Sequence, residues 1–176
     1  MEKKLERQEI YTGKVIHVTK DKVVLDNGTQ SYREGVYHNG GACIALKDID
    51  NKFFMVRQFR YVPDMEMLEF PAGKIEIGEN PDETILRECV EETGFSCKNV
   101  KKLGFMVPTC GYSSEKIYLY YGEVDSDVGQ HFDVDEDLKL EKYSMEEIKQ
   151  MIKDNVISDA KTICIVQKLE LEGIIK

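Results

Sequence analysis

The chain of 176 residues contains no tryptophan, and no run of apolar residues in it is long enough to span a membrane. Its first ten residues, MEKKLERQEI, are charged and lack the apolar segment of a secretory signal. These absences predict a cytoplasmic protein with no membrane partner. The composition, 41% hydrophobic and 32% charged residues, is that of a globular domain long enough to bury a substantial core.

The five cysteines form no CxxC pair and no His/Cys cluster, which argues against a zinc site and a disulfide framework. Basic residues are also few: 24 lysines and arginines face 33 acidic residues, giving a net charge of -9. This balance excludes a basic surface for nucleic acid. Such a chain can still bind a phosphate ester if cations or a few arginines offset the repulsion. The histidines, His17, His38 and His131, are isolated and are interpreted as non-catalytic.

Turn signals and β-branched runs predict a chain rich in strands. Residues 8–38 are expected to form hairpins, with the Asp-Asn-Gly turn at 26–28 as the strongest signal. Strands and helices follow without regular βαβ alternation, which favours a layered α+β fold. Residues 1–38 are therefore expected to form an antiparallel β extension that needs a packing partner, and residues 39–176 the main domain. Further strands are expected over 41–49, 52–60, 68–75 and 116–124, and helices over 81–93, 144–154 and 159–172.

The helix expected over residues 81–93 carries clear boundary signals. Asn80 is a suitable N-cap, Pro81 follows at the first helical position, and Gly94 supplies the stop. At about 100° per residue the helix is amphipathic. Its core-facing stripe is expected to be Ile85, Leu86, Cys89 and Val90.

The opposite face of this helix is crowded with acid. Glu88, Glu91 and Glu92 lie together, and Arg87 stands four residues before Glu91, a spacing that allows an ion pair. One interpretation is a solvated acidic face that keeps the protein soluble. However, like charges four residues apart destabilise a helix by roughly 0.2–0.5 kcal/mol. The alternative is that these oxygens hold Mg²⁺ or Mn²⁺, which prefer carboxylate ligands.

The spacing around the acidic face decides between the two interpretations. From Gly73, five residues lead to Glu79 and seven more to Arg87-Glu88, followed by an apolar residue, Glu91-Glu92, Gly94 and an apolar residue. This resembles the Nudix box, G-x5-E-x7-R-E-U-x-E-E-x-G-U, with every specified position filled. The resemblance implies an α/β/α sandwich with a mixed sheet, and a loop–helix–loop that holds divalent cations against a diphosphate.

Carried over position by position, the resemblance implies roles for the box residues. Arg87 orients the glutamates, and Gly73 and Glu79 support the loop around them. A glutamate of the box is also an alternative general base. The implied metal ligands are Glu88, Glu91, Glu92 and the carbonyl oxygen of Ala72.

Outside the box, residues from about 30 to the end resemble ADP-ribose pyrophosphatases. The implied reaction is Mg²⁺-dependent hydrolysis of ADP-ribose to AMP and ribose 5-phosphate, by a homodimer whose N-terminal strands exchange. A nucleotide-sugar pyrophosphatase acting on GDP-mannose, and a catalytically silent nucleotide sensor, are the alternatives. The sequence departs from the subfamily at 108–111, Pro-Thr-Cys-Gly in place of Ser-Pro-Gly, and has no tryptophan to stack on adenine.

The same resemblance implies substrate contacts. Arg60 stands on the strand before the box and is expected to bind the substrate, whereas Glu69 is a structural residue or a weak contact. Arg33 and Glu34 are either an exposed strand pair or part of the active site. Glu115, in a loop that is mobile in the subfamily, is expected to be the general base.

Overall fold

The computed structural model describes residues 1–129 and 138–175, which form two compact units. The first unit contains Met1–Gly40 and Val107–Lys116, and the second contains Gly41–Met106 and Ile117–Lys176. The segment 107–116 therefore belongs to the unit built by the N-terminal strands, although it lies far from them in sequence. The domain boundary at residue 38 stays a prediction.

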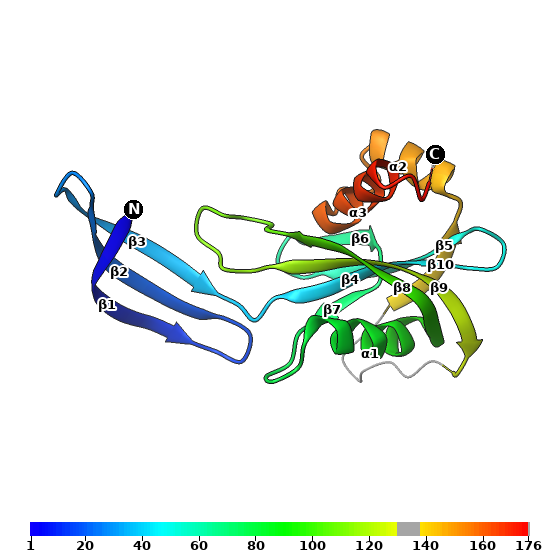
Figure 1. The fold of residues 1–176 in the computed structure, drawn as a ribbon, viewed down its shortest axis with the longest axis horizontal. Coiled ribbons are helices and arrows are strands. Elements are labelled where there is room, and N and C mark those ends of the chain that lie inside the picture. Colours follow the sequence, from blue (N-terminus) through cyan, green and yellow to red (C-terminus); the bar gives the residue numbers. More distant parts are fainter. Residues whose placement is uncertain (130–137, 176) are drawn as a thin grey trace. The chain divides into compact units, whose positions relative to one another are not determined.

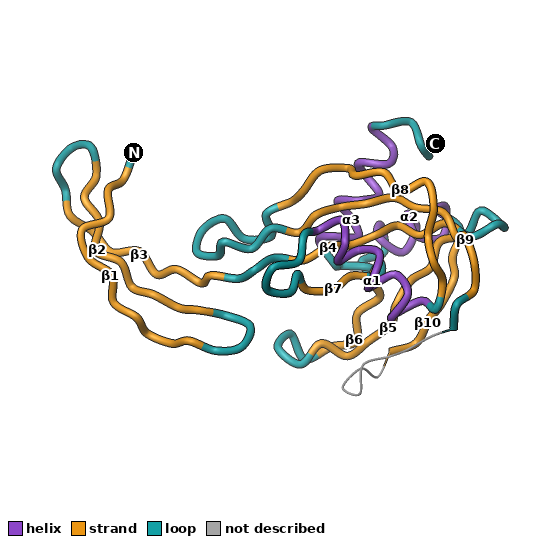
Figure 2. The backbone as a smooth tube through the Cα atoms, turned by 60° about the horizontal axis from the view of Figure 1, so that its bottom comes forward, coloured by secondary structure: helices purple, strands orange, loops and turns teal. Residues whose placement is uncertain are grey.

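The first unit is an antiparallel three-stranded sheet in the order β1-β2-β3 (Figure 2). Its strands are β1 (Glu2–Thr12), β2 (His17–Leu25) and β3 (Gln30–Tyr37). The predicted turn is present, with Gly28 at φ 83° and its N–H donating to Leu25 O at 2.9 Å. The segment 107–116 bonds to the end of β3, since Val36 N donates to Tyr112 O at 2.8 Å and Ser114 N to Val36 O at 2.9 Å.

The second unit contains a seven-stranded mixed sheet with the path β10-β5-β4-β9-β8, in which β6 pairs with β5 and β7 with β4. The central pair β4–β9 is parallel and the other pairs are antiparallel. The strands are β4 (Gly41–Lys47), β5 (Phe53–Arg60), β6 (Met65–Glu69), β7 (Ala72–Lys74), β8 (Phe95–Met106), β9 (Ile117–Asp127) and β10 (Leu138–Tyr143).

Three helices, α1 (Pro81–Thr93), α2 (Met145–Lys153) and α3 (Ala160–Leu171), begin at side-chain caps. Asn80 and Ser144 each form a capping box, which satisfies backbone N–H groups that the first turn leaves unpaired. Asp159 caps α3. Gly94 ends α1 in the left-handed conformation at φ 78°. Among the described residues, none of the helices is long and apolar enough to cross a bilayer.

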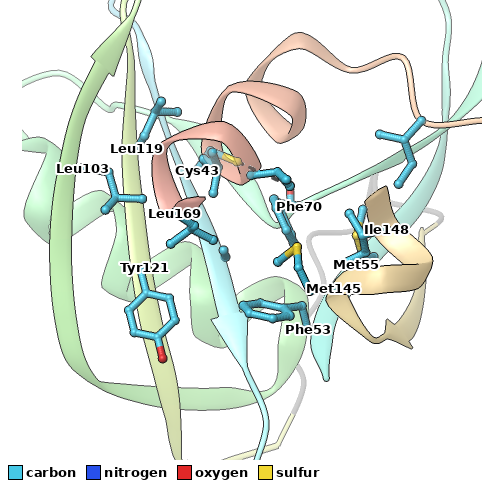
Figure 3. Close-up of a cluster of buried hydrophobic side chains, with 14 of the residues drawn as sticks. Cys43, Phe53, Met55, Phe70, Leu103, Leu119, Tyr121, Met145, Ile148 and Leu169 are labelled. Atoms are coloured by element: carbon cyan, nitrogen blue, oxygen red, sulfur yellow. Dashed lines mark hydrogen bonds between the residues drawn. The ribbon is translucent and has the colours of Figure 1, made fainter. Parts of the chain in front are cut away.

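The helices cover both faces of this sheet, α1 on one and α2 with α3 on the other (Figure 1). Successive residues of a strand point to opposite faces of the sheet, so the buried side chains form two clusters, one on each face. On β4, Ile44 packs towards α1 with Ile85, whereas Cys43 packs towards Ile165 and Ile148 on the other face. Figure 3 shows the cluster on the α2 and α3 face, where Phe53, Phe70 and Leu169 converge. The predicted α+β fold, a mixed sheet between helical layers with an N-terminal antiparallel sheet, is confirmed.

One local expectation is wrong, and two strands have no counterpart in the expectations. Leu86 was expected in the core, but it is 47% exposed, because α1 buries the faces that carry Ile85 and Glu88 instead. The strands β8 and β10 were not predicted. β8 is polar along much of its length, and its register shifts at three places against β9, so no clean alternation of apolar residues marks it in sequence.

Candidate active site

A single guanidinium organises the acidic face of α1. Arg87 donates from Nε and Nη2 to the two oxygens of Glu79, at 3.0 and 3.1 Å. Its Nη1 donates to Glu88 Oε1 at 2.8 Å and to Glu91 Oε2 at 2.7 Å, and its Nη2 reaches Lys74 O at 3.2 Å. Three carboxylates and one carbonyl therefore share one cation, which relieves the repulsion that their spacing creates.

The Arg87 guanidinium also controls the charge state of Glu79, in the loop that precedes α1. The hydrogen bonds from Arg87 lower the pKa of Glu79 to about 2 against a smaller opposing effect of burial, with help from Glu76 N–H and the Thr84 hydroxyl. Thr84 Oγ1 donates to Glu79 Oε2 at 2.8 Å. Glu79 is thus ionised at neutral pH and tied to both the loop and the helix.

The acidic face is not a solvated surface. Glu88 is 8% exposed and Glu92 only 2%, so both carboxylates are buried between α1 and the sheet. Glu92 Oε2 accepts a hydrogen bond from Ala72 N at 2.9 Å, which joins the helix to the start of β7. Buried carboxylates are costly unless charged or polar partners surround them.

Glycine at position 73 is what allows Glu88 to lie against β7. A Cβ on Gly73 would stand 1.7 Å from the carboxyl carbon of Glu88 and 1.8 Å from its Oε1. The backbone of β7 therefore forms a cradle for this carboxylate. The cradle places Glu88 beside the segment that carries the carbonyl of Ala72.

The donor set fits a hard divalent cation by its chemistry: three glutamates and a backbone carbonyl are oxygen ligands of the kind that Mg²⁺ and Mn²⁺ prefer. Among the described residues, no three His, Cys, Asp or Glu side chains surround a common point. Instead, the glutamates lie against Arg87 and the Ala72 amide. Cation binding would therefore require these side chains to rotate away from their present partners.

Arg60 and Glu69 form a second charged pair in the same unit. Arg60 donates from Nε and Nη2 to the two oxygens of Glu69, both at 2.7 Å. Sequence reasoning missed the third member, Lys161, which also donates to Glu69. One signal could have revealed it: Lys161 stands in the first turn of a helix, where the helix dipole disfavours a cation.

In the first unit, Glu115 lies in the segment 107–116 that bonds to β3. Its N–H donates to Ser113 Oγ at 3.1 Å, and its Oε1 lies 3.5 Å from His38 Nδ1. His38 Nδ1 also accepts from Gly40 N at 2.9 Å. Of the other two histidines, His17 contacts Glu9 on β1, and His131 lies outside the described residues.

Arg33 and Glu34 diverge, because successive residues of β3 point to opposite faces. Arg33 donates to Glu2 of β1 from Nε at 3.0 Å. Glu34 lines a hollow of about 380 Å³ within the first unit. The other residues lining that hollow are Ile10, Val18, Thr19, Lys20, Gly35, Val36 and Tyr112.

The sequence profile of the NUDIX domain matches residues 37–164. A methanol dehydrogenase activator from Bacillus methanolicus is 36% identical, over 99% of this chain and 96% of the relative. An ADP-ribose pyrophosphatase from Bacillus subtilis (strain 168) is 33% identical, over 97% of this chain and 94% of the relative. A GDP-mannose pyrophosphatase from Yersinia enterocolitica is 33% identical, over 92% and 90% respectively.

A solved structure, described as an ADP compounds hydrolase, superposes with a TM-score of 0.84 at 18% identity. The match covers 99% of this chain and 97% of that one. At this identity the likeness shows a shared fold.

We predict that Gly73→Ala separates cation binding from folding. The added methyl group meets the end of a flexible glutamate side chain, so the protein should still fold, with a free energy of unfolding lower by about 1–3 kcal/mol because Glu88 loses its bond to Arg87. Glu88 must move, however, and the affinity for Mn²⁺, measured by titration calorimetry, should fall roughly 10- to 100-fold. Gly13→Ala is the matched control, because its Cβ would meet Tyr11 at 2.7 Å, away from the box residues in sequence and in the other unit. Unchanged Mn²⁺ affinity in Gly73→Ala would contradict the cradle.

Proposed function

This chain belongs to the NUDIX family, and from that membership we propose that it hydrolyses the pyrophosphate of ADP-ribose, with Mg²⁺ as cofactor and Mn²⁺ as a possible substitute. The membership confirms the resemblance seen in the box, and the chain is a Nudix pyrophosphohydrolase. Water and ADP-ribose would give AMP and ribose 5-phosphate, by cleavage of one P–O bond of the phosphoanhydride.

The observation that supports this reaction is the acidic face of α1, where Glu88 and Glu91 bond to Arg87, Glu92 bonds to the Ala72 amide, and Glu88 and Glu92 are buried. A pyrophosphate is anionic, and so is this chain, with a net charge of -9. Carboxylates on one helix face can bind an anionic pyrophosphate only if cations lie between the carboxylates and the phosphates. The complete box also argues against the silent sensor, because every acidic position needed for hydrolysis is present.

In this proposal Glu88, Glu91, Glu92 and the Ala72 carbonyl hold the cations. When bound, these ions neutralise phosphate charge and lower the pKa of a coordinated water. Arg87 holds Glu88 and Glu91 in place, and the Ala72 amide holds Glu92. Each glutamate can then use its second oxygen, or its first after a small rotation, as a ligand.

Glu115 is proposed as the general base that accepts a proton from the attacking water, with a glutamate of the box as the alternative. The placement of its segment supports Glu115. The segment is bonded to β3 through Val36, and Glu115 Oε1 lies 3.5 Å from His38 Nδ1 in the same unit.

The choice of ADP-ribose rests on the relatives. An ADP-ribose pyrophosphatase aligns over 97% of this chain, including the N-terminal strands. GDP-mannose is the second candidate, because a GDP-mannose pyrophosphatase is equally identical over 92%. The methanol dehydrogenase activator is named for an activation and not for a substrate, so it does not alter this choice.

We further propose a homodimer formed through the β1–β3 sheet, by the exchange of N-terminal strands that the resemblance implies. A three-stranded sheet with little core of its own is marginal in water. Almost every residue of β1 is exposed, including the apolar side chains of Leu5, Ile10 and Tyr11. A second copy would bury them. The predicted cytoplasmic location and the predicted lack of a nucleic-acid partner stay predictions.

The proposed substrate is tested by product release from a panel of ADP-ribose, GDP-mannose and a nucleoside triphosphate, each with Mg²⁺ and with excess chelator. We expect AMP from ADP-ribose with the highest kcat/KM, and loss of at least about 10³-fold when the cation is removed. Faster release of GMP from GDP-mannose would select the second candidate. Activity that survives the chelator would overturn the role of the glutamates.

Replacing Glu115 by Gln should lower kcat roughly 10²–10⁴-fold, because general-base catalysis contributes about this much. Mn²⁺ affinity should stay as in the wild type, since Glu115 is not among the proposed ligands. Ser114→Ala is the control for disturbance of the segment, because Ser114 neighbours Glu115 and carries no carboxylate. A wild-type rate in Glu115→Gln would show that Glu115 is not the general base and would favour a glutamate of the box.

Sedimentation at micromolar concentration should give a species of twice the 20.3-kDa chain mass. Ile10→Lys, on the exposed face of β1, should shift it to the monomer, because a desolvated lysine at an interface is unfavourable. Ile49→Lys is the matched control, an exposed isoleucine in a turn of the second unit. A wild-type monomer would remove the proposed dimer.

A further inference from the structure

Four charged side chains alternate in sign between the β5–β6 hairpin and the start of α3. Arg60 donates two hydrogen bonds to Glu69, Glu69 also accepts from Lys161, and Lys161 Nζ donates to Asp159 Oδ1 at 2.9 Å. All four belong to the second unit. Arg60 is the most exposed member of the series, since its side chain is 38% exposed, against 1% for Glu69 and 11% for both Lys161 and Asp159.

Lys161 occupies a position that a lysine has physical reasons to avoid. Its side chain is 11% exposed, and it stands in the first turn of α3, where the helix dipole repels a cation. Burial lowers the pKa of its ammonium group, but Asp159 and Glu69 outweigh that effect, so the net direction is upward. Lys161 is therefore a buried cation at neutral pH, held by two carboxylates.

The carboxylates are themselves held by the backbone. Asp159 Oδ2 accepts from Thr162 N at 2.9 Å and from Thr162 Oγ1 at 2.7 Å. The same hydroxyl accepts from Phe70 N at 2.9 Å, and Phe70 is the residue directly after Glu69. The first turn of α3 thus makes two contacts around Glu69. Thr162 bonds the backbone of the next residue, Phe70, and Lys161 bonds the side chain of Glu69.

Glu69 in turn determines where Arg60 lies. In the β5–β6 ladder, Glu69 faces Val56, four residues before Arg60 on β5. The Arg60 side chain therefore runs back along the sheet instead of extending from the hairpin tip. Its bonds to Glu69 use Nε and Nη2, and within residues 1–129 and 138–175 its Nη1 makes no hydrogen bond. Glu69 is the main cause of the raised pKa of Arg60, and the charge of Glu92 makes a smaller contribution. The guanidinium therefore interacts electrostatically with a glutamate of the box.

We infer that Lys161 is a positioning residue, which fixes Glu69 and through it presents Arg60 as an oriented cation to an anionic group of the substrate. The identity of that substrate rests on the proposed function. With Arg60 alone, the charge of Glu69 would cancel that of the guanidinium. With Lys161 also bound, Glu69 divides its charge between two cations, even though Asp159 shares Lys161, and Arg60 keeps attraction for a phosphate oxygen.

The test is a double-mutant cycle of Lys161→Met and Arg60→Lys with ADP-ribose. Lys161→Met should raise KM about tenfold and change kcat less than about twofold, because an oriented charge that binds substrate and transition state equally affects KM. The double mutant should be no worse than Arg60→Lys alone, since both changes remove one interaction. Lys168→Met, on the same helix but outside the network, should leave KM unchanged.

A second readout needs no turnover. The ¹⁵N–¹H signal of Arg60 Nε, identified by its loss in Arg60→Lys, should shift or broaden in Lys161→Met and stay in place in Lys168→Met. If the wild type does not hydrolyse ADP-ribose, the proposed function fails and this signal alone decides the inference. Lys161→Gln, which keeps a donor of similar length, replaces Lys161→Met if that variant does not fold.

Two results would overturn the inference. One is a Lys161→Met protein with lowered stability but wild-type KM and an unchanged Arg60 signal, which would make Lys161 a structural residue only. The other is a rise in KM that adds to that of Arg60→Lys, which would mean that the two side chains act independently.

Discussion

The geometry of the site depends on one guanidinium, that of Arg87. Glu79, Glu88 and Glu91 converge on it, so acidic residues that would repel one another are held within one network. The network also explains how α1 can bury the carboxylate of Glu88 on its inner side. Ile85 and Cys89 anchor the helix to the sheet, and Arg87 balances the charge beside them. Packing and charge thus support the same orientation of one helix.

The segment from Glu69 to Gly73 is held from three directions. Phe70 N bonds to Thr162 of α3, Pro71 O accepts from Ile44 of β4, and Ala72 N bonds to Glu92 of α1. Each of these contacts comes from a different part of the chain. The carbonyl of Ala72 and the side chain of Glu69 therefore have little freedom. A cation site needs a fixed carbonyl, and the positioning of Arg60 needs a fixed Glu69.

Features with a local cause could be predicted from the sequence, and features with a distant cause could not. The caps of all three helices depend on residues a few positions apart, and so does the box that places Glu88 four residues before Glu92. The burial of Glu88 could not be predicted, because it depends on how α1 packs against the cradle at Gly73 in β7. Lys161 was missed for the same reason: its partner Glu69 lies 92 residues away.

The proposed base and the proposed cation ligands belong to different units of the chain. The segment of Glu115 is bonded to β3 at Val36, whereas the glutamates of the box belong to α1 in the second unit. Because hydrogen bonds couple this segment to β3, whatever orders the β1–β3 sheet also orders Glu115. The proposed dimer and the proposed base are therefore not independent. A partner chain that buries the exposed side chains of β1 would stabilise the sheet to which the base is attached.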